Sequence, residues 1–163
     1  MAEVFLSIGS NVDREAHIPE SLRQIAELFG PLIVSSVYES EAVGFQGDPF
    51  FNLAVGFSSE LPALEIARIL REIEIAHGRT ENSRKFEPRS LDIDLIIYGD
   101  QVLNEGGLRL PRDEIARYAF MLEPLAEIAP DFTHPGLGRT FAQLWASFEK
   151  SFLRQKKLGL PKA

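Results

Sequence analysis

The stretch Leu91-Asp92-Ile93-Asp94-Leu95-Ile96-Ile97-Tyr98 decides the fold expected for this chain, because apolar and acidic residues alternate along it. Successive side chains of a β-strand point to opposite faces of a sheet. A strand over 91–98 therefore places Asp92 and Asp94 together on one face and alternate apolar side chains on the other. The apolar set is Leu91, Ile93, Leu95 and Ile97.

Helix and strand patterns alternate irregularly on both sides of this stretch. Short apolar or alternating runs predict strands over 4–8, 33–38 and 52–58, and a hairpin formed by 101–104 and 108–110. Helical spacing predicts helices over 18–29 and 62–77, a helical turn near 113–118 and a last helix around 140–152. The apolar side of the 62–77 helix holds Ile66, Ile69, Leu70, Ile73 and His77. This pattern predicts an α+β fold with an antiparallel or mixed sheet.

The composition excludes several classes of protein. The chain has 163 residues, 24 acidic against 17 basic side chains, and no cysteine. A chain of this length fits one domain, and the absence of cysteine excludes a disulfide scaffold, a thiolate zinc site and a cysteine nucleophile. A formal net charge of −7 argues against broad nucleic-acid binding. With no basic leader and no apolar run of about 18 residues, we expect a cytoplasmic protein that does not bind membranes.

The two aspartates of the 91–98 strand form the first candidate site. They lie about 7 Å apart on one face, where their repulsion is on the order of 2 kcal/mol at an intermediate dielectric. Either the face is solvated and nearby arginines pair with both carboxylates, or the pair holds a hard cation. Mg²⁺ is the cation that takes carboxylate oxygens together with waters and phosphate oxygens.

A basic segment precedes this strand in an otherwise acidic chain. Residues 79–89 carry four basic side chains, Arg79, Arg84, Lys85 and Arg89, against two acidic ones. Guanidinium groups match phosphate oxygens, so a carboxylate pair with Mg²⁺ beside this segment would complete a polyphosphate site. The alternative is a solvated loop whose arginines balance the aspartates.

Other familiar catalytic patterns are missing from the sequence. No Gly-Lys pair of a phosphate-binding loop occurs, and Gly9-Ser10-Asn11 indicates only a turn. His17, His77 and His134 have no ligand spacing, and no Gly-x-Ser-x-Gly nucleophile motif is present.

The segment from Pro88 to Ile96 closely resembles the signature of the 6-hydroxymethyl-7,8-dihydropterin pyrophosphokinase family. Further matches follow in the family's order, and the resemblance covers nearly the whole chain up to about residue 145. They are Ile8-Gly9-Ser10-Asn11, Ser35-Ser36-Val37-Tyr38, Asn52-Leu53-Ala54-Val55, Glu74 with Gly78-Arg79, Phe120-Met121-Leu122 with Pro124-Leu125, and Glu127-Ile128-Ala129-Pro130.

The resemblance implies a fold and an activity. The fold is a ferredoxin-like α+β sandwich, a mostly antiparallel sheet with helices packed on it. The activity transfers pyrophosphate from ATP, the co-substrate, to a dihydropterin in folate biosynthesis. It requires two Mg²⁺ ions and no covalent enzyme intermediate, and the enzyme is expected to be a monomer.

The resemblance also implies roles for individual residues. Asp92 and Asp94 would hold the metal ions, and Arg79, Arg89 and Asp94 would be catalytic. ATP would be bound by Leu70, Arg71, Glu74, Arg84, Phe86, Arg89, Leu95, Arg109 and Arg112. The pterin would be bound by Ser40, Val43, Phe50, Asn52, Asp92 and Phe120, with the two phenylalanines as stacking partners.

The chain departs from the family pattern around these positions. Phe86 and Glu87 replace a frequent Trp and Gly, and Arg112-Asp113 replaces a frequent His-Tyr pair. Tyr118 stands where an arginine is common, and Phe50 where a tyrosine is common.

Two other functions are compatible with the same residues. The rivals are a binding module that has lost transfer and a two-metal phosphohydrolase that uses the same aspartates. We expect one pyrophosphokinase domain over 1–163, a solvated tail over 150–163, and loops 42–50 and 80–88 that close over the substrates.

Overall fold

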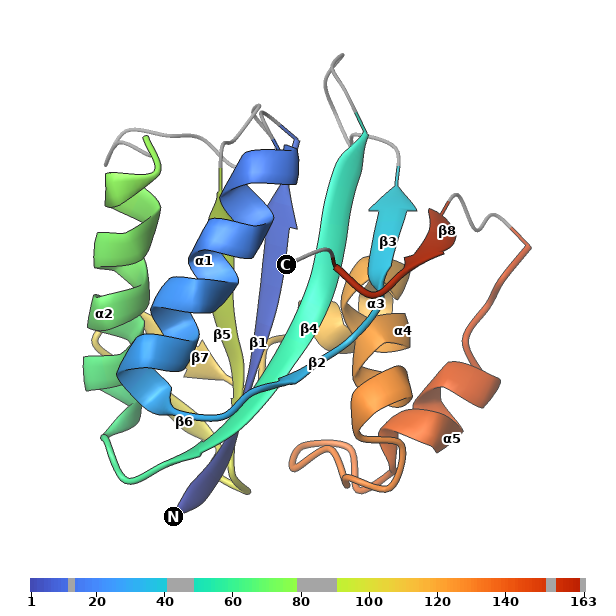
Figure 1. Cartoon of the computed structure of the whole chain (residues 1–163). Helices are drawn as coiled ribbons and strands as arrows, with labels where there is room; N and C mark the ends of the chain where they lie inside the picture. The colour runs from blue at the N-terminus through green and yellow to red at the C-terminus, as the bar shows by residue number, and fades with distance from the viewer. Residues whose placement is uncertain (12–13, 41–48, 79–90, 152–154, 162–163) are drawn as a thin grey trace.

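An antiparallel sheet forms the centre of the computed structural model, which describes residues 1–11, 14–40, 49–78, 91–151 and 155–161 (Figure 1). The strand order is β5-β1-β4-β3-β8, and the short β2 pairs with β4. Every pair in this sheet is antiparallel. The strands are β1 (Ala2–Ser10), β2 (Ile33–Val34), β3 (Val37–Ser40), β4 (Phe50–Ser59), β5 (Asp92–Tyr98) and β8 (Gln155–Gly159).

The topology is ferredoxin-like. Along the chain, β1, α1 (Arg14–Phe29), β3, β4, α2 (Ala63–Ala76) and β5 follow one another, and the four strands lie in the order β5-β1-β4-β3. Each helix therefore connects two strands that are not neighbours in the sheet. The predicted α+β fold with its mostly antiparallel sheet is confirmed.

Helices α1 and α2 cover one face of the sheet (Figure 1). Ile25 of α1 and Ile66 and Leu70 of α2 pack against Leu6 and Ile8 of β1. The helix predicted over 62–77 is confirmed, with Pro62 at its N-cap and His77 at its C-cap. Its predicted apolar side is buried at Ile66, Leu70 and Ile73, and half-buried at Ile69 and His77.

The opposite face is covered by α3 (Glu114–Arg117), α4 (Ala119–Ile128) and α5 (Phe141–Ala146). Phe5 of β1 and Ala54 of β4 pack there with Leu122 of α4 and Phe141 of α5. Helix α4 was not predicted, and α5 ends at Ala146 instead of continuing toward residue 152. A capping box at Thr140 fixes the start of α5.

An irregularity in β5 changes which way one predicted core residue points. Phe5 pairs with Ile97 and Leu6 pairs with Leu95, so Ile96 is an extra residue on β5. The bulge turns Ile97 toward the α3–α5 face, whereas Leu91, Ile93 and Leu95 pack toward α1 and α2. The prediction that Ile97 shares a face with the other three was therefore wrong.

The C-terminal segment differs from the solvated tail expected over 150–163. Residues Gln155–Gly159 form β8, which pairs with β3 at the edge of the described sheet. This segment contains two adjacent lysines and no alternation of apolar and polar residues. Its pairing with a strand far away in sequence leaves no periodic pattern, so the strand could not be predicted from the sequence.

The predicted hairpin is confirmed. Strands β6 (Leu103–Glu105) and β7 (Leu108–Leu110) pair around Gly106 and Gly107, which have φ angles of 58° and 79°. The strand predicted over 33–38 is split into β2 and β3 by Ser35-Ser36. Within the described ranges, every helix is too short or too polar to cross a bilayer.

Candidate active site

At one end of the sheet, polar residues of three strands lie in one row with a glycine of a fourth. Gly9 of β1 pairs with Asp92 on one side and with Asn52 on the other, and Asn52 pairs with Tyr38. Paired residues of neighbouring strands share a face, so Asp92, Gly9, Asn52 and Tyr38 form one row across the sheet. Because Ile93 packs on the α1–α2 side, this row lies on the opposite face, which also carries α3 and α4.

Asp92 and Asp94 lie together on that face, as the alternation predicts. Both side chains are half-buried, and Asp94 pairs across the sheet with Ser7. The described residues contain no group of three or more His, Cys, Asp or Glu that could hold a metal ion. Two carboxylates from one strand nevertheless fit Mg²⁺, which takes few protein ligands and completes its shell with waters and substrate phosphates.

Arg112 lies beside the acidic pair. Its Nη1 is 3.5 Å from Oδ1 of Asp94, its Nη2 donates to Oε2 of Glu114 at 2.7 Å, and its backbone N–H donates to the Ile96 carbonyl at 3.1 Å. Burial opposes the charge of Arg112, but the hydrogen bond to Glu114 and the attraction of Asp94, Glu114 and Asp92 outweigh it and raise its pKa. Arg112, predicted as an ATP ligand, thus offsets the repulsion between the aspartates.

Glu74 reaches the same strand from α2. It is buried, and its Oε2 accepts a hydrogen bond of 2.7 Å from the backbone N–H of Ile93, between the two aspartates. The contact fixes the end of α2 against β5.

The other predicted ATP ligands in the described chain are more scattered. Leu70 and Leu95 are only 2% and 4% exposed, and their side chains pack in the core beneath α2. Arg71 is half-buried on α2. Arg109 lies on β7, is largely exposed and is 3.4 Å from Asp113. Their predicted contacts with ATP stay predictions.

Three of the predicted pterin ligands meet over Gly9. Asn52 is buried, and its Nδ2 donates to Ser40 Oγ at 2.8 Å. A Cβ atom at Gly9 would lie 2.8 Å from Asn52 Oδ1 and 3.7 Å from a ring carbon of Phe50. The missing side chain therefore lets Asn52 and Phe50 lie close to the backbone of β1.

Phe120 approaches from the helical layer. It lies in the first turn of α4, which packs on β4 and β3, and its ring stacks on Tyr118 with centroids 5.3 Å apart and planes at 29°. The guanidinium of Arg117 lies over the ring of Tyr118, 5.5 Å from its centroid.

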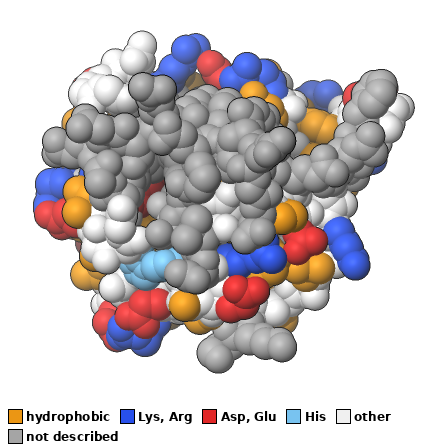
Figure 2. Space-filling model, turned by 90° about the horizontal axis from the view of Figure 1, so that it is seen from above, with side chains coloured by type: hydrophobic (Ala, Val, Ile, Leu, Met, Phe, Trp, Pro, Cys, Tyr) orange, Lys and Arg blue, Asp and Glu red, His pale blue; other side chains and the backbone are white. Residues whose placement is uncertain are grey.

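Several predicted residues lie outside the described residues. They are Val43, Arg79, Arg84, Phe86 and Arg89, and with them most of the two loops expected to close over the substrates. Figure 2 looks onto this end of the molecule, where described basic, acidic and histidine side chains surround the undescribed atoms.

Arg14, in the first turn of α1, was not predicted from the sequence. Its Nη1 donates to the Pro49 carbonyl at 2.5 Å, its guanidinium lies 4.1 Å from the Phe51 ring centroid, and its Nη2 is 4.0 Å from Glu39. Arg14 thus ties α1 to the end of β3 and the start of β4. A single arginine after a polar turn gives no sequence signal for such a role. The pairing of Glu114 with Arg112 was also missed.

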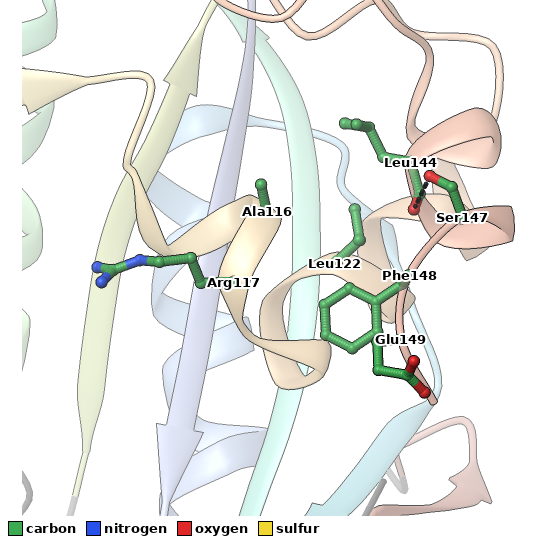
Figure 3. Close-up of a pocket in the computed structure, with 7 residues that line it drawn as sticks. All are labelled: Ala116, Arg117, Leu122, Leu144, Ser147, Phe148 and Glu149. Atoms are coloured by element: carbon green, nitrogen blue, oxygen red, sulfur yellow. Dashed lines mark hydrogen bonds between the residues drawn. The ribbon is translucent and has the colours of Figure 1, made fainter. Parts of the chain in front are cut away.

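A cavity of about 410 Å³ lies elsewhere, between α3, α4 and α5 (Figure 3). Its lining combines apolar side chains with the polar groups of Arg117, Ser147 and Glu149, and Arg117 points away from the others (Figure 3). None of the predicted site residues lines this cavity.

Comparison with known proteins decides the family. Residues 5–130 match the sequence model of 7,8-dihydro-6-hydroxymethylpterin-pyrophosphokinase (HPPK). The chain belongs to the HPPK family. The match includes Gly9, Asn52, Asp92, Asp94 and Phe120, and it ends before β8.

Curated HPPK relatives match most of the chain. A 2-amino-4-hydroxy-6-hydroxymethyldihydropteridine pyrophosphokinase of Aquifex aeolicus is 34% identical over 137 residues, which cover 83% of this chain and 85% of the relative. The enzyme of the same name from Pseudomonas aeruginosa is 32% identical over 151 residues, which cover 88% of this chain and 90% of the relative.

Solved structures of the HPPK family share the fold. An HPPK-DHPS crystallised in complex with substrates superposes with a TM-score of 0.72 over 96% of this chain, at 15% sequence identity. The chain spans 47% of that longer protein. This likeness supports the ferredoxin-like arrangement and not the individual site residues.

Proposed function

We propose that this protein is the HPPK of its cell, transferring pyrophosphate from ATP to 6-hydroxymethyl-7,8-dihydropterin in folate biosynthesis. The observation that carries the proposal is the row of residues across the sheet. In this row, Asp92 of the acidic pair lies beside Gly9. Because Gly9 has no side chain, Asn52 and Phe50 can lie close to the sheet. A phosphate-metal site and a site for a flat, polar ring thus adjoin on one face.

The proposed reaction is a single displacement. The hydroxymethyl oxygen of the pterin attacks the β-phosphorus of ATP, and the bond from that phosphorus to the oxygen bridging it to the α-phosphorus breaks. AMP leaves with that oxygen, and the pterin gains a diphosphate. The hydroxyl proton passes to a base, for which Asp94 is our candidate.

Electrostatics and positioning supply most of the rate in such a reaction. Asp92 and Asp94 would hold two Mg²⁺ ions, which when bound neutralise phosphate charge and orient the phosphates. Arg79 and Arg89 would neutralise the transferring group. Arg112 adds a further guanidinium, 3.5 Å from Asp94, and Glu74 keeps β5 in place.

The pterin would be held on the β1, β4 and α4 side of the row. Asn52 would hydrogen-bond its edge, as would the backbone near Ser40 and Val43, and Phe50 and Phe120 would stack on its faces. The hydrogen bond between Asn52 and Ser40 fixes the amide orientation before the ring arrives.

Product analysis tests the reaction. Purified protein with ATP, Mg²⁺ and the hydroxymethyl pterin should give AMP and pterin diphosphate in equal amounts, and neither without Mg²⁺ or pterin. ADP or inorganic phosphate would favour the phosphohydrolase alternative. Pterin binding without AMP release would favour the binding-module alternative.

Substitution of the acidic pair tests the metal assignment. Asp92→Ala or Asp94→Ala should lower AMP formation at least about 100-fold and leave the melting temperature close to that of the parent, because the repulsion is removed with the charge. Asp100→Ala, in the exposed turn after β5, is the matched control and should keep full activity. Near-normal turnover of either site variant would contradict the assignment.

The two-ion count, the monomeric state, the single domain over 1–163 and the cytoplasmic location stay predictions.

A further inference from the structure

The C-terminal strand β8 is attached to two separate parts of the proposed pterin site. Its backbone pairs with β3, where Gln155 lies opposite Ser40. Ser40 in turn accepts the hydrogen bond from Asn52. The strand therefore extends the part of the sheet that carries Ser40 and the side-chain amide of Asn52, which we call the Ser40–Asn52 wall.

The side chain of Gln155 reaches the second part, the first turns of α4. Its Nε2 donates to the Ala119 carbonyl at 3.1 Å and to Oε1 of Glu123 at 2.8 Å. Ala119 directly precedes Phe120, the stacking residue of the other wall. Gln155 is half-buried, so both hydrogen bonds form in a partly dehydrated environment, where they are stronger than at the surface.

The last turn of α4 is fixed to β3 and to the residue before it by a different group. Glu127 accepts hydrogen bonds from the backbone N–H and the hydroxyl of Ser36 and from the hydroxyl of Tyr38, at 2.7 to 3.1 Å. Lys157 of β8 lies 3.9 Å from the same carboxylate. Because Glu127 holds the far end of the helix, the contacts of Gln155 act on the end that carries Phe120.

We propose that Gln155 is a positioning residue for the pterin site. It sets the separation between the Ser40–Asn52 wall on the sheet and the Phe120 wall on α4, into which a flat ring must fit. The inference rests on the proposed function. It assigns to β8, beyond the matched family region, a part in recognising one of the two substrates.

Removal of the amide tests the inference. Gln155→Leu keeps the strand and loses both hydrogen bonds, so α4 can shift at its first turn. We expect the KM for the pterin to rise about tenfold, equivalent to about 1.4 kcal/mol, while the KM for ATP changes less than about twofold. A fluorescence titration of the pterin, in the presence of a non-hydrolysable ATP analogue, should show the same loss without depending on turnover.

A polarity swap separates positioning from simple destabilisation. Gln155→Glu sets two carboxylates together and should weaken pterin binding at least as much as the leucine variant. Adding Glu123→Gln lets the new glutamine donate a hydrogen bond to the new carboxylate at position 155. The hydrogen bond to the Ala119 carbonyl is not restored. The double variant should therefore regain part of the pterin affinity.

Lys156→Ala is the matched control, because Lys156 lies on the same strand, is exposed and pairs with Glu39. It should leave both KM values unchanged. The inference is wrong if the parent enzyme is active and Gln155→Leu keeps the parental pterin KM, if both KM values rise equally, or if the swap restores nothing. Absence of pterin diphosphate with the parent enzyme would instead overturn the proposed function.

Discussion

Gly9 shows how a single residue can shape the proposed pterin site through the side chain it lacks. A Cβ there would lie 2.8 Å from Asn52 Oδ1, closer than van der Waals contact allows. Asn52 is buried and bonded to Ser40, so it cannot give way without losing that bond. The position therefore requires glycine because of the neighbouring side chain and not because of its backbone angles.

We predict that Gly9→Ala weakens pterin binding more than it weakens the fold. The displaced Asn52 loses its bond to Ser40, worth about 1 kcal/mol, so the pterin KM should rise about fivefold or more. Steady-state kinetics and thermal melting measure the two effects. Gly56→Ala is the contrasting control, because its Cβ would meet the Phe5 ring at 2.9 Å in the core. It should lower the melting temperature and spare the pterin KM, and the reverse ranking of the two variants would contradict the model of the site.

The acidic pair could be predicted from the sequence, whereas its partner could not. Alternation along one strand is a local property, and it placed Asp92 and Asp94 on one face. Arg112 returns to Asp94 only because the β6–β7 hairpin folds back beside β5, which no spacing reveals. Ile97 was assigned to the wrong face because one extra residue in a strand inverts the alternation beyond it.

A pair of histidines joins helix α1 to the C-cap of helix α2. The Nδ1 atoms of His17 and His77 are 2.6 Å apart, and Nε2 of His77 is 2.9 Å from Oε1 of Gln24. The neutral pair is satisfied when His77 donates to Gln24 and accepts from His17. Burial and the nearby His17 lower the pKa of His77, and Glu20 opposes this shift.

This pair should make the α1–α2 contact sensitive to acid. Because the pKa of His77 is lower in the folded protein than its ordinary value of 6.5, the unfolded chain binds more protons as the pH falls through that range. The contribution of His77 to stability is therefore fully present above pH 6.5 and is lost as the pH falls below that value. Urea unfolding at pH 7.5 and 5.5 should show a smaller decline for His17→Gln, which keeps a hydrogen-bond donor and removes the neighbouring ring that lowers the pKa of His77.

Glu20→Gln is the opposite control, because it removes the carboxylate that favours the charged histidine and should enlarge the acid effect. The buried His134 also has a lowered pKa, so some acid sensitivity should remain in every variant. An unchanged decline in His17→Gln would show that the histidine pair does not contribute.

Elements with strong local periodicity were predictable, and those defined by tertiary pairing were not. The 62–77 helix has apolar residues at helical spacing, and its C-cap is followed by Gly78, which has a φ of 101°. Helix α4 is apolar on most sides and contains Pro124, so it lacks the amphipathic signal of a surface helix. All five residues of strand β8 are half-buried or exposed, and its backbone pairing with β3 defines it.

At the scale of the whole molecule, both proposed substrates would meet at one end of a sheet that is covered on both faces. Residues of strands β1, β3, β4 and β5 meet there. Four helices each contribute one side chain that fixes or faces this end: Arg14 from α1, Glu74 from α2, Glu114 from α3 and Phe120 from α4. Ligands that bridge these elements should therefore stabilise the entire fold, because they bind the folded protein and not the unfolded chain.

We predict that this stabilisation depends on Mg²⁺. A non-hydrolysable ATP analogue at about 100 times its Kd, with Mg²⁺, contributes about 2.7 kcal/mol, which corresponds to a rise in melting temperature of about 5–10 °C for a chain of this size. With EDTA in place of Mg²⁺ the rise should nearly vanish, since the phosphates would then face Asp92 and Asp94 without a cation between them. In Asp92→Ala, the rise in melting temperature caused by the ATP analogue should differ less between Mg²⁺ and EDTA than in the parent protein. An equal rise for the parent protein in Mg²⁺ and in EDTA would show that nucleotide binding does not pass through the acidic pair.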